Sequence, residues 1–381
     1  MRDKRLDILR AIAVILVLLR HSDLFVVWTR LGWIGVDLFF VLSGFLISGL
    51  LFNEYKAHGR IRLGRFYARR ALKIYPAFYV LIFVTLVYSI ARNHTFPPLS
   101  RMFAEVFFFQ DYFPGLWNHT WSLAVEEHFY ALLPIVLLLL LRFGRSLDPF
   151  RALPEIFVVL SLILTVLRYF ADPRDGKFFL YPTHLRIDSL LCGVVLSYYF
   201  HFGNHSYRRL SGSKWLPYAS AVCLLPAVVL DVNAPLMHSL GVTLLYFGFG
   251  GVLVWFSGVS MPTQGPLRWL AGLLACVGTQ SYSIYLWHVP MAFGGLHLMR
   301  IVCEKLRLPM VYVYAHGLVY ILGSIILGIA MARLVEFPVL RIRDRMIPSR
   351  SKALDIASAK ERHAVPGVDG GEAPASSVVA T

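Results

Sequence analysis

The sequence predicts an all-α integral membrane protein, a bundle of about ten transmembrane helices with both termini cytoplasmic. Of its 381 residues, 57% are hydrophobic and only 15% are charged, a composition typical of membrane proteins and unlike that of soluble domains. Apolar runs close to the ~20 residues that cross a bilayer recur along the chain. Basic residues gather in alternate connections between these runs, as expected when positively charged loops stay in the cytoplasm.

The apolar runs define the expected spans in chain order. They cover about residues 8–29, 33–53, 74–91, 122–141, 155–170, 185–202, 215–231, 239–257, 267–290 and 311–335. The first run follows a basic start, MRDKR, and lacks an A-x-A-like cleavage site. It is therefore expected to be a retained span rather than a cleaved signal peptide.

The basic residues assign each connection to a side of the membrane. The N-terminus, the even-numbered connections and the C-terminal segment carry most of them. The second connection is rich in bases: Lys56, Arg60, Arg62, Arg65, Arg69, Arg70 and Lys73. Odd-numbered connections carry few bases or mix them with acids, as in residues 172–177. The positive-inside rule therefore places the even-numbered connections and both ends in the cytoplasm.

Two segments are not expected to be spans. Residues 92–121 contain the aromatic run FAEVFFFQDYF, which can lie along the membrane interface as an amphipathic helix. The end of the chain is rich in Ala, Ser, Gly and charge, which predicts a disordered cytoplasmic tail over residues 346–381. Residues 1–345 are then one transmembrane domain, with no separate soluble domain.

Composition and motifs exclude several functional classes. Lys and Arg exceed Asp and Glu by 37 to 22, but they sit in short loops, so no nucleic acid partner is expected. The four cysteines have neither metal-ligand nor disulfide-framework spacing. The G-x-S-x-G, H-E-x-x-H and G-x-x-x-x-G-K-[ST] motifs are absent, so a serine hydrolase elbow, a zinc site and a phosphate-binding loop are not expected.

The first expected span carries charge where lipid would make it costly. Arg10 and His21 are eleven residues apart, which puts them within about 20° on one helical face and roughly 16 Å apart along the axis. Asp7 shares that face. Ionisable groups inside a membrane usually face the protein interior and mark a substrate path or proton relay. The alternative is that Arg10 snorkels at one end and His21 caps the other.

The expected topology places further polar groups near the depth of His21. They come from separate spans in the outer half of the membrane: Asp37, Glu126 with Glu127, Arg186 with Asp188, and His288. A histidine beside carboxylates suits general acid–base chemistry near neutral pH, because the carboxylate fixes the tautomer and stabilises the imidazolium. Five such groups at one level predict a site, although charges near helix ends are also common structural features.

The cytoplasmic side predicts a second site. Arg69, Arg70 and Lys73 fall on one or two adjacent helical faces, which suits binding of phosphate oxygens. The alternative is that these charges only fix orientation and touch lipid headgroups. That alternative explains their number but not their concentration beside Arg10.

Several blocks together resemble the membrane-bound acyltransferase 3 family. Arg10 and His21 match its signature of Arg or Lys, ten residues, then His. The other similar blocks are GWIGVDLFFVLSGFLIS (32–48), FYARRALKIYP, TWSLAVEEHFYALLP, SYSIYLWHVP and EFPVLR (336–341). The likeness runs from about residue 5 to 345. Two positions depart from the pattern: the second Arg of Arg-x-x-Arg is Lys73, and the Gln after the paired Glu is His128.

The resemblance implies transfer of an acyl group, most commonly acetyl, from cytoplasmic acyl-CoA to a hydroxyl of a sugar, glycoconjugate or glycoside, in the inner membrane of a bacterium. Arg10, Arg69, Arg70 and Lys73 would hold the acyl-CoA. His21 would act as general base or as transient acyl carrier. Glu126 or Glu127 would orient it or shuttle protons, with Asp37 and His288 as further site residues. No metal is implied.

The resemblance also raises the question of partners. Some family members carry an extra extracytoplasmic hydrolase-like domain, and none is expected here, so direct transfer or a separate polysaccharide-assembly protein would complete the reaction.

Two other functions stay open from the residues alone. One is a non-enzymatic permease for a glycolipid or polysaccharide precursor. The other is a glycosyltransferase that uses a lipid-linked sugar, although the acidic loop motifs of that class are missing.

Overall fold

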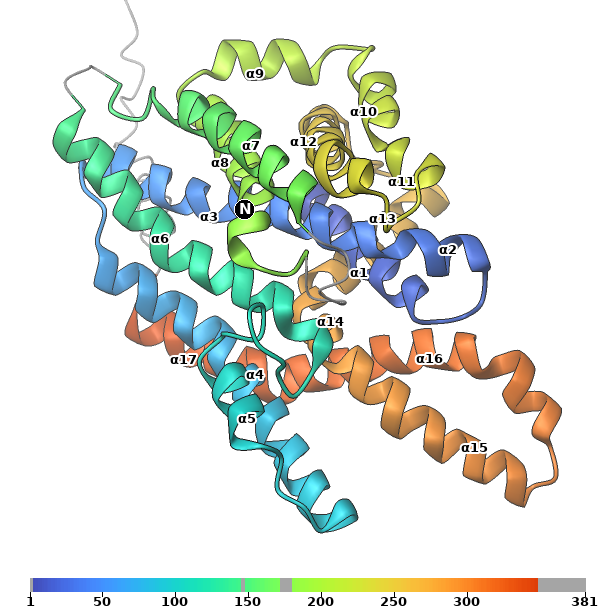
Figure 1. Ribbon diagram of the computed structural model, residues 1–381. Coiled ribbons are helices and arrows are strands. Elements are labelled where there is room, and N and C mark those ends of the chain that lie inside the picture. The colour runs from blue at the N-terminus through green and yellow to red at the C-terminus, as the bar shows by residue number, and fades with distance from the viewer. Residues whose placement is uncertain (1–2, 145–147, 172–179, 349–381) are drawn as a thin grey trace, which may run out of the picture.

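The computed structural model describes residues 3–144, 148–171 and 180–348, and these residues form helices, turns and loops without a strand (Figure 1). The α-helices of the first half are α1 (Lys4–Arg20), α2 (Val26–Leu31), α3 (Gly35–His58), α4 (Leu63–Asn93), α5 (Leu99–Val106), α6 (Trp121–Phe143), α7 (Leu153–Phe170) and α8 (Ile187–His201). Those of the second half are α9 (Asn204–Ser211), α10 (Leu216–Leu224), α11 (Pro226–Val229), α12 (Val242–Gly258), α13 (Gly265–Thr279), α14 (Ser281–Pro290), α15 (Leu296–Lys305), α16 (Pro309–Met331) and α17 (Phe337–Met346). Short 3-10 or π turns extend or link them: η1 (Gly32–Ile34), η2 (Asn118–Thr120), η4 (Thr183–Leu185), η5 (Met237–Gly241), η6 (Met291–Gly295) and η7 (Ala332–Glu336).

Six continuous helices in the described chain are long and apolar enough to cross a membrane: Val26–His58, Leu63–Arg92, Asn118–Phe143, Leu153–Phe170, Met237–Gly258 and Ala315–Met346. Each contains most or all of one expected span. The other four expected spans correspond to shorter helices: α1, α8, α10 with α11, and α13 with α14. The protein is therefore all-helical and built for multiple membrane crossings, as the composition predicts.

Two expected spans are interrupted. The prediction of one helix over 8–29 is wrong in its second half, because α1 ends at Arg20 and Asp23 adopts the left-handed backbone region at φ 51°. Polar residues between Arg20 and Asp23 favour this turn over a continued helix. The expected span 267–290 breaks at Gln280, between α13 and α14. Both breaks lie next to residues of the candidate site.

Close helix contacts form the centre of the bundle. α3 packs along α8, and α1 packs along α13 and α3. At the α3–α8 contact a Cβ on Gly44 would overlap the Leu190 carbonyl, and one on Gly193 would overlap the Val41 carbonyl. Small residues of this kind let membrane helices approach closely and pack well. Glycine is therefore required at both positions for α3 to sit at its observed distance from α8.

The basic second connection is mostly helical. α4 begins at Leu63, about three turns before the apolar run 74–91 that is expected to cross the membrane. The run of Arg and Lys therefore extends the apolar helix rather than preceding it. In Figure 1 α17 lies beside this part of α4, in agreement with their packing.

Outside the main bundle, the segment 92–121 contains α5, whose Ala104 and Glu105 are buried while Leu99 and Phe103 are exposed. α15 and α16 form a pair that extends away from the rest of the molecule (Figure 1). α17 ends at Met346, and the tail predicted for residues 346–381 lies almost entirely outside the described residues.

Candidate active site

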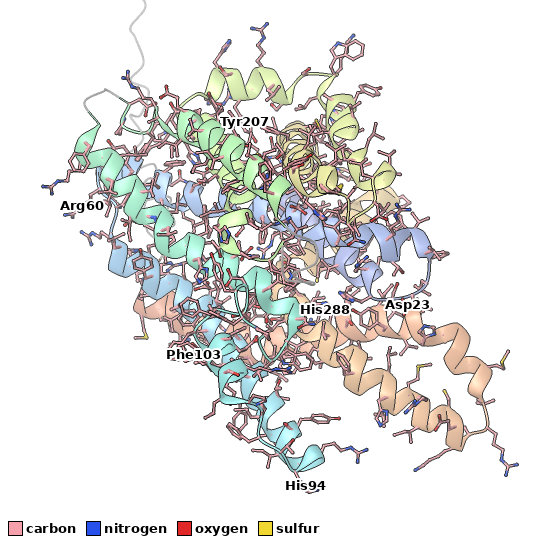
Figure 2. All side chains as sticks on the ribbon, in the orientation of Figure 1. Asp23, Arg60, His94, Phe103, Tyr207 and His288 are labelled. Atoms are coloured by element: carbon pink, nitrogen blue, oxygen red, sulfur yellow. The ribbon has the colours of Figure 1, made fainter. Side chains whose placement is uncertain are left out.

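Three histidines from distant parts of the chain form a cluster, called here the histidine cluster: His21, His119 and His288. His21 directly follows α1, His119 lies in η2, and His288 lies near the end of α14. The ring centroid of His288 is 5.4 Å from that of His21 and 4.9 Å from that of His119. His288 is fully buried, His119 is 9% exposed and His21 is exposed. Figure 2 labels His288, which lies in the interior near the point where α14 and α16 meet.

Hydrogen bonds assign the tautomers of the two buried rings. His288 Nδ1 faces the Tyr285 carbonyl, and His119 Nε2 lies 3.2 Å from the Leu286 carbonyl. A carbonyl accepts only, so each of these nitrogens carries the proton and the opposite nitrogen carries a lone pair. Those opposite atoms, His288 Nε2 and His119 Nδ1, are buried and have no hydrogen-bond partner among the described residues. The histidine cluster thus contains two buried proton-accepting nitrogens.

Tyr285 fixes the turn that carries His119. Its hydroxyl donates to the His119 carbonyl at 2.6 Å and lies 2.6 Å from Ser122 Oγ. Its ring centroid is also 5.8 Å from that of His119 and 5.4 Å from that of His288. α14, η2 and the first turn of α6 are therefore held together at the cluster.

A second group of ionisable side chains, called here the charged cluster, lies further along α1 and α6: Arg10 is about three turns from His21, and Glu126 is about two turns from His119. Its members are Arg10, Arg70, Lys73, Glu126, Glu127 and Glu336. Lys73 Nζ lies 3.2 Å from Glu336 Oε1, and Ser283 Oγ donates to Glu336 Oε2 at 2.7 Å. The charges of Arg10 and Arg70 both act on Glu126. Opposite charges inside a membrane bundle stabilise one another in this way.

The two glutamates of α6 have different neighbours. Glu126 Oε2 accepts a hydrogen bond of 2.7 Å from Tyr130, whose ring lies 4.3 Å from the Arg70 guanidinium carbon. Glu127 interacts with Arg70 and with the Tyr75 hydroxyl. The sequence predicts a carboxylate beside His21, but the described contacts place both glutamates among arginines and tyrosines. α14 links the charged cluster to the histidines through Glu336, since it carries both Ser283, which donates to Glu336, and His288.

Arg69 lies apart from the charged cluster. Its guanidinium is 3.1 Å from Asp344 Oδ1 and donates to the Ile347 carbonyl. Arg65 likewise donates to the Pro348 carbonyl. Of the four residues predicted to hold a cofactor, the structure therefore gathers Arg10, Arg70 and Lys73, while Arg69 contacts the end of α17.

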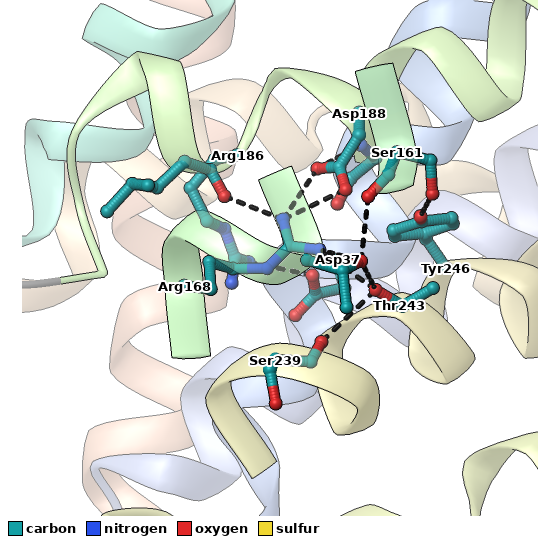
Figure 3. A network of polar contacts seen from close by, with 11 residues as sticks. Asp37, Ser161, Arg168, Arg186, Asp188, Ser239, Thr243 and Tyr246 are labelled. Atoms are coloured by element: carbon teal, nitrogen blue, oxygen red, sulfur yellow. Dashed lines mark hydrogen bonds and ion pairs between the residues drawn. The ribbon is translucent and has the colours of Figure 1, made fainter. Parts of the chain in front are cut away.

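Asp37 belongs to a buried ion-pair network (Figure 3). Its Oδ1 accepts a 2.7 Å bond from Arg186, and Arg168 lies 2.9 Å from Asp188 Oδ2. Arg168 also donates to Thr243 on α12, at 2.9 Å. The four charged side chains are at most 3% exposed, and they join α3, α7, α8 and α12. These ion pairs and hydrogen bonds connect four helices, and their described contacts include none of the three histidines.

His128 and Lys73, the two residues that depart from the sequence pattern of the resemblance, also have defined contacts. His128 Nδ1 lies 2.7 Å from Thr183 Oγ1 and 3.5 Å from Asp111 Oδ2. Asp111 in turn accepts from the Thr183 backbone amide at 3.0 Å. His128 therefore ties α6 to two connections between helices, whereas Lys73 keeps the charge of the expected arginine and pairs with Glu336.

Sequence reasoning missed three members of the site. His119 lies in a segment expected at the membrane interface, and its one signal is its position two residues before Trp121 in the block TWSLAVEEHFYALLP. Tyr285 and Glu336 lie inside the blocks SYSIYLWHVP and EFPVLR, which were used for the resemblance without a role for either residue. Their importance depends on helix packing, which the blocks alone do not specify.

The site therefore combines a proton-accepting histidine cluster, open at His21, with a charged cluster further along α1, α4 and α6. Such a pairing suits transfer of a group from an anionic donor to a hydroxyl. The acyltransferase 3 family model, described as an acyltransferase domain, matches residues 3–333. The chain belongs to the acyltransferase 3 family. The charged and histidine clusters therefore lie in the acyltransferase domain, except Glu336, which follows the matched range.

Curated relatives agree with this membership. The peptidoglycan O-acetyltransferase OatA of Listeria monocytogenes is 31% identical over 319 residues, which cover 75% of this family member and 49% of the relative. The O-acetyltransferase OatA of Staphylococcus aureus is 29% identical over 321 residues, 75% of this chain and 50% of the relative. The putative peptidoglycan O-acetyltransferase YrhL of Bacillus subtilis is 30% identical over 316 residues, 75% of this chain and 48% of the relative. The chain spans about half the length of the curated relatives it matches. No solved structure gives a significant match.

Proposed function

We propose that the protein is a membrane O-acyltransferase that moves an acetyl group from cytoplasmic acetyl-CoA to a sugar hydroxyl of a cell-surface or exported polysaccharide. The observation that carries this proposal is the position of α1. Arg10 on this helix acts on Glu126 of the charged cluster, and His21 at its end contacts the buried ring of His288. One helix thus links an anion-binding region to a proton-accepting region.

The proposal includes a topology. The six membrane-length helices and the four shorter ones together make about ten crossings, with both termini cytoplasmic and the chain in the inner membrane of a bacterium. Charge bias supports this orientation, because the bases of α4 and of α17 then lie on the cytoplasmic side. Arg10 faces that side and His21 the opposite one.

The charged cluster suits the phosphates of the donor. Arg70 Nε is buried and has no hydrogen-bond partner in the described chain, so it can donate to a phosphate oxygen. Arg10 and Lys73 add positive charge beside it, and Arg65 and Arg69 continue the basic surface along α4. Acetyl-CoA would supply an activated acetyl thioester. The roughly 16 Å between Arg10 and His21 along α1 matches the length of an extended pantetheine arm.

His21 acts as the general base. It is exposed, so an acceptor hydroxyl can reach it, and it accepts the hydroxyl proton as the oxygen attacks the acetyl carbonyl carbon. The ester C–O bond forms, the C–S bond of the thioester breaks, and CoA leaves as the thiolate. The lone pair of His288 Nε2 lies in the same cluster and can take up the proton after that step. Tyr285 holds His119 and Ser122 in place around them.

A polysaccharide acceptor is supported by the names of similar proteins: those from Listeria monocytogenes and Bacillus subtilis are named as peptidoglycan O-acetyltransferases, the latter putatively. Mass spectrometry of envelope glycans tests the function. Four strains are compared: the host, a deletion strain, and the deletion strain carrying either the wild-type or the His21→Ala gene. O-acetyl esters are expected in the host and the wild-type complement only. Full acetylation in the His21→Ala strain would exclude this residue as the base, and full acetylation in the deletion strain would exclude the function.

A further inference from the structure

Four buried polar atoms lie around the seam between α14, α16 and the His119 turn, and none of them has a hydrogen-bond partner of suitable geometry in the described part of the chain. They are His119 Nδ1, His288 Nε2, Tyr320 Oη and Ser324 Oγ. Tyr320, Ser324 and His288 are fully buried, and His119 is 9% exposed. Burying a polar group without a partner is unfavourable, so a cluster of them in one place calls for a ligand that hydrogen-bonds.

Helix packing puts Ser324 at the level of His288. Gly328 packs against Ile284, and Gly323 packs against Met291, so α16 runs antiparallel to α14. His288 lies four residues after Ile284, and Ser324 lies four residues before Gly328. In antiparallel helices these equal steps bring the two residues to the same height.

Tyr320 lies on the side of Ser324 that leads to His21. It is one turn from Ser324 on the same face of α16, and the two hydroxyls are near each other. Further along α16, Gly317 packs against the Ser22 carbonyl and Leu24, close behind His21. The hydroxyls of Tyr320 and Ser324 therefore follow the seam from the buried histidines to the exposed one.

The chemistry of these groups selects the ligand class. Two hydroxyls and two neutral imidazole nitrogens donate and accept hydrogen bonds without charge. They match a neutral ligand rich in hydroxyl groups, whereas an anion would call for Arg or Lys. We propose that this seam binds the acceptor saccharide, with Tyr320 and Ser324 hydrogen-bonded to sugar hydroxyls next to the one that reacts at His21. This inference rests on the proposed function and assigns its acceptor site.

The test measures acceptor and donor kinetics separately in the purified full-length protein. A panel of soluble oligosaccharides that includes chitotetraose and peptidoglycan glycan fragments is assayed with acetyl-CoA, and the best acceptor is kept. Tyr320→Phe and Ser324→Ala each remove one hydroxyl oxygen. Each is expected to raise the acceptor KM about fivefold, with the KM for acetyl-CoA unchanged, since one hydrogen bond to substrate is lost.

Matched controls carry the same changes elsewhere. Ser281→Ala removes another fully buried, unpartnered hydroxyl, two turns before His288 on α14, and Tyr207→Phe removes a buried hydroxyl on α9. Both are expected to keep the wild-type acceptor KM. A direct measurement of acceptor binding to His21→Ala, with and without Tyr320→Phe, gives a readout independent of turnover.

The outcomes separate this inference from the function. If Tyr320→Phe and Ser324→Ala keep the wild-type acceptor KM while His21→Ala loses transfer, the seam holds water and the inference is wrong, but the function stands. If the wild-type protein acetylates no oligosaccharide in the panel, the proposed acceptor class fails. A thermal melt of each variant identifies any change that comes from misfolding.

Discussion

The imidazole rings of His21 and His288 lie 5.4 Å apart, although one follows the first helix and the other lies near the end of α14. His288 is fully buried and held by the Tyr285 carbonyl, while His21 is exposed. The pair therefore joins the surface of the bundle to its interior. This relationship supports the proposal that His288 belongs to the active site.

The first prediction concerns His288. The His288→Gln variant keeps most of the side-chain volume but loses the basic nitrogen, so the kcat for O-acetylation is expected to fall about 100-fold. The KM for acetyl-CoA is expected to stay near the wild-type value, because the proposed binding site of the donor phosphates is the charged cluster. His238→Gln is the matched control, since His238 is equally buried and contacts the Val232 carbonyl instead. A wild-type kcat for His288→Gln would remove it from the proton path.

The second prediction separates two adjacent arginines. Arg70 lies in the charged cluster with a free Nε, whereas Arg69 contacts Asp344 and the end of α17. Arg70→Ala is therefore expected to raise the KM for acetyl-CoA about tenfold, and Arg69→Ala about twofold at most. Exposed Arg300 on α15 provides the control Arg300→Ala, with no change expected. Equal effects of all three would reduce the basic residues of α4 to determinants of orientation.

The sequence predicts how deep a residue lies in the helix bundle better than it predicts which side chains that residue contacts. Periodicity and charge bias place His21 and His288 at one level, and the structure brings their rings together. They also place Asp37 at that level, yet its carboxylate pairs with Arg186. Depth follows from counting residues along each span, but the direction a side chain faces depends on how helices pack. Packing here depends on contacts such as Gly44 against Leu190, which no local pattern specifies.

His119 is a second residue whose contacts the sequence does not predict, and it lies in a connection between expected spans. Its segment, 92–121, is aromatic and was expected to lie along the interface, so a buried histidine at residue 119 has no periodic signal. Its position depends on Tyr285, which donates to the His119 carbonyl from a helix far along the chain. The breaks at Asp23 and Gln280 were likewise missed, because apolar residues on both sides favour a continuous span.

The third prediction tests whether Asp37 is structural. Asp37→Asn leaves the buried Arg186 guanidinium without its charge partner, which is expected to lower the free energy of unfolding by about 3 kcal/mol. The kcat of the folded fraction is expected to stay within about twofold of wild type. Denaturation in mixed micelles and activity per folded molecule check the two halves. An Asp37→Asn protein with wild-type stability and no activity would make Asp37 catalytic, as the sequence alone suggested.

The fourth prediction concerns the Lys73–Glu336 pair. Its atoms lie 3.2 Å apart, with Glu336 only 1% exposed, so each single change, Lys73→Met or Glu336→Gln, is expected to destabilise by about 2 kcal/mol. The double variant is expected to be more stable than the sum of the two losses by about 1 kcal/mol or more, because it leaves no unpaired charge. Arg300 and Glu304, an exposed pair at 3.8 Å, form the control cycle with an expected coupling of about 0.3 kcal/mol. Purely additive losses at Lys73 and Glu336 would show that the two side chains do not stabilise each other.

The fifth prediction is a pH dependence that originates at Glu105 in α5. This carboxyl group is fully buried, and burial raises its pKa to about 7, although it accepts backbone hydrogen bonds from Leu116 and Trp117. Between about pH 4.5 and 7 the folded protein holds a proton on Glu105 that the unfolded chain has released. Stability contributed by this group is therefore present at low pH and is lost as the pH rises towards 7.

Glu105→Gln keeps the shape and the accepting oxygen but does not titrate. Melting temperatures of the purified protein in detergent, measured from pH 5 to pH 8, are therefore expected to fall less steeply for Glu105→Gln than for wild type, with the difference confined to the range below about pH 7. The comparison cancels the histidines, which titrate in both proteins. Glu105 accepts a hydrogen bond from Trp117, two residues before His119. We therefore also expect Glu105→Gln to keep the wild-type kcat for O-acetylation at pH 8. Parallel melting curves across the whole range would show that Glu105 titrates at its ordinary value.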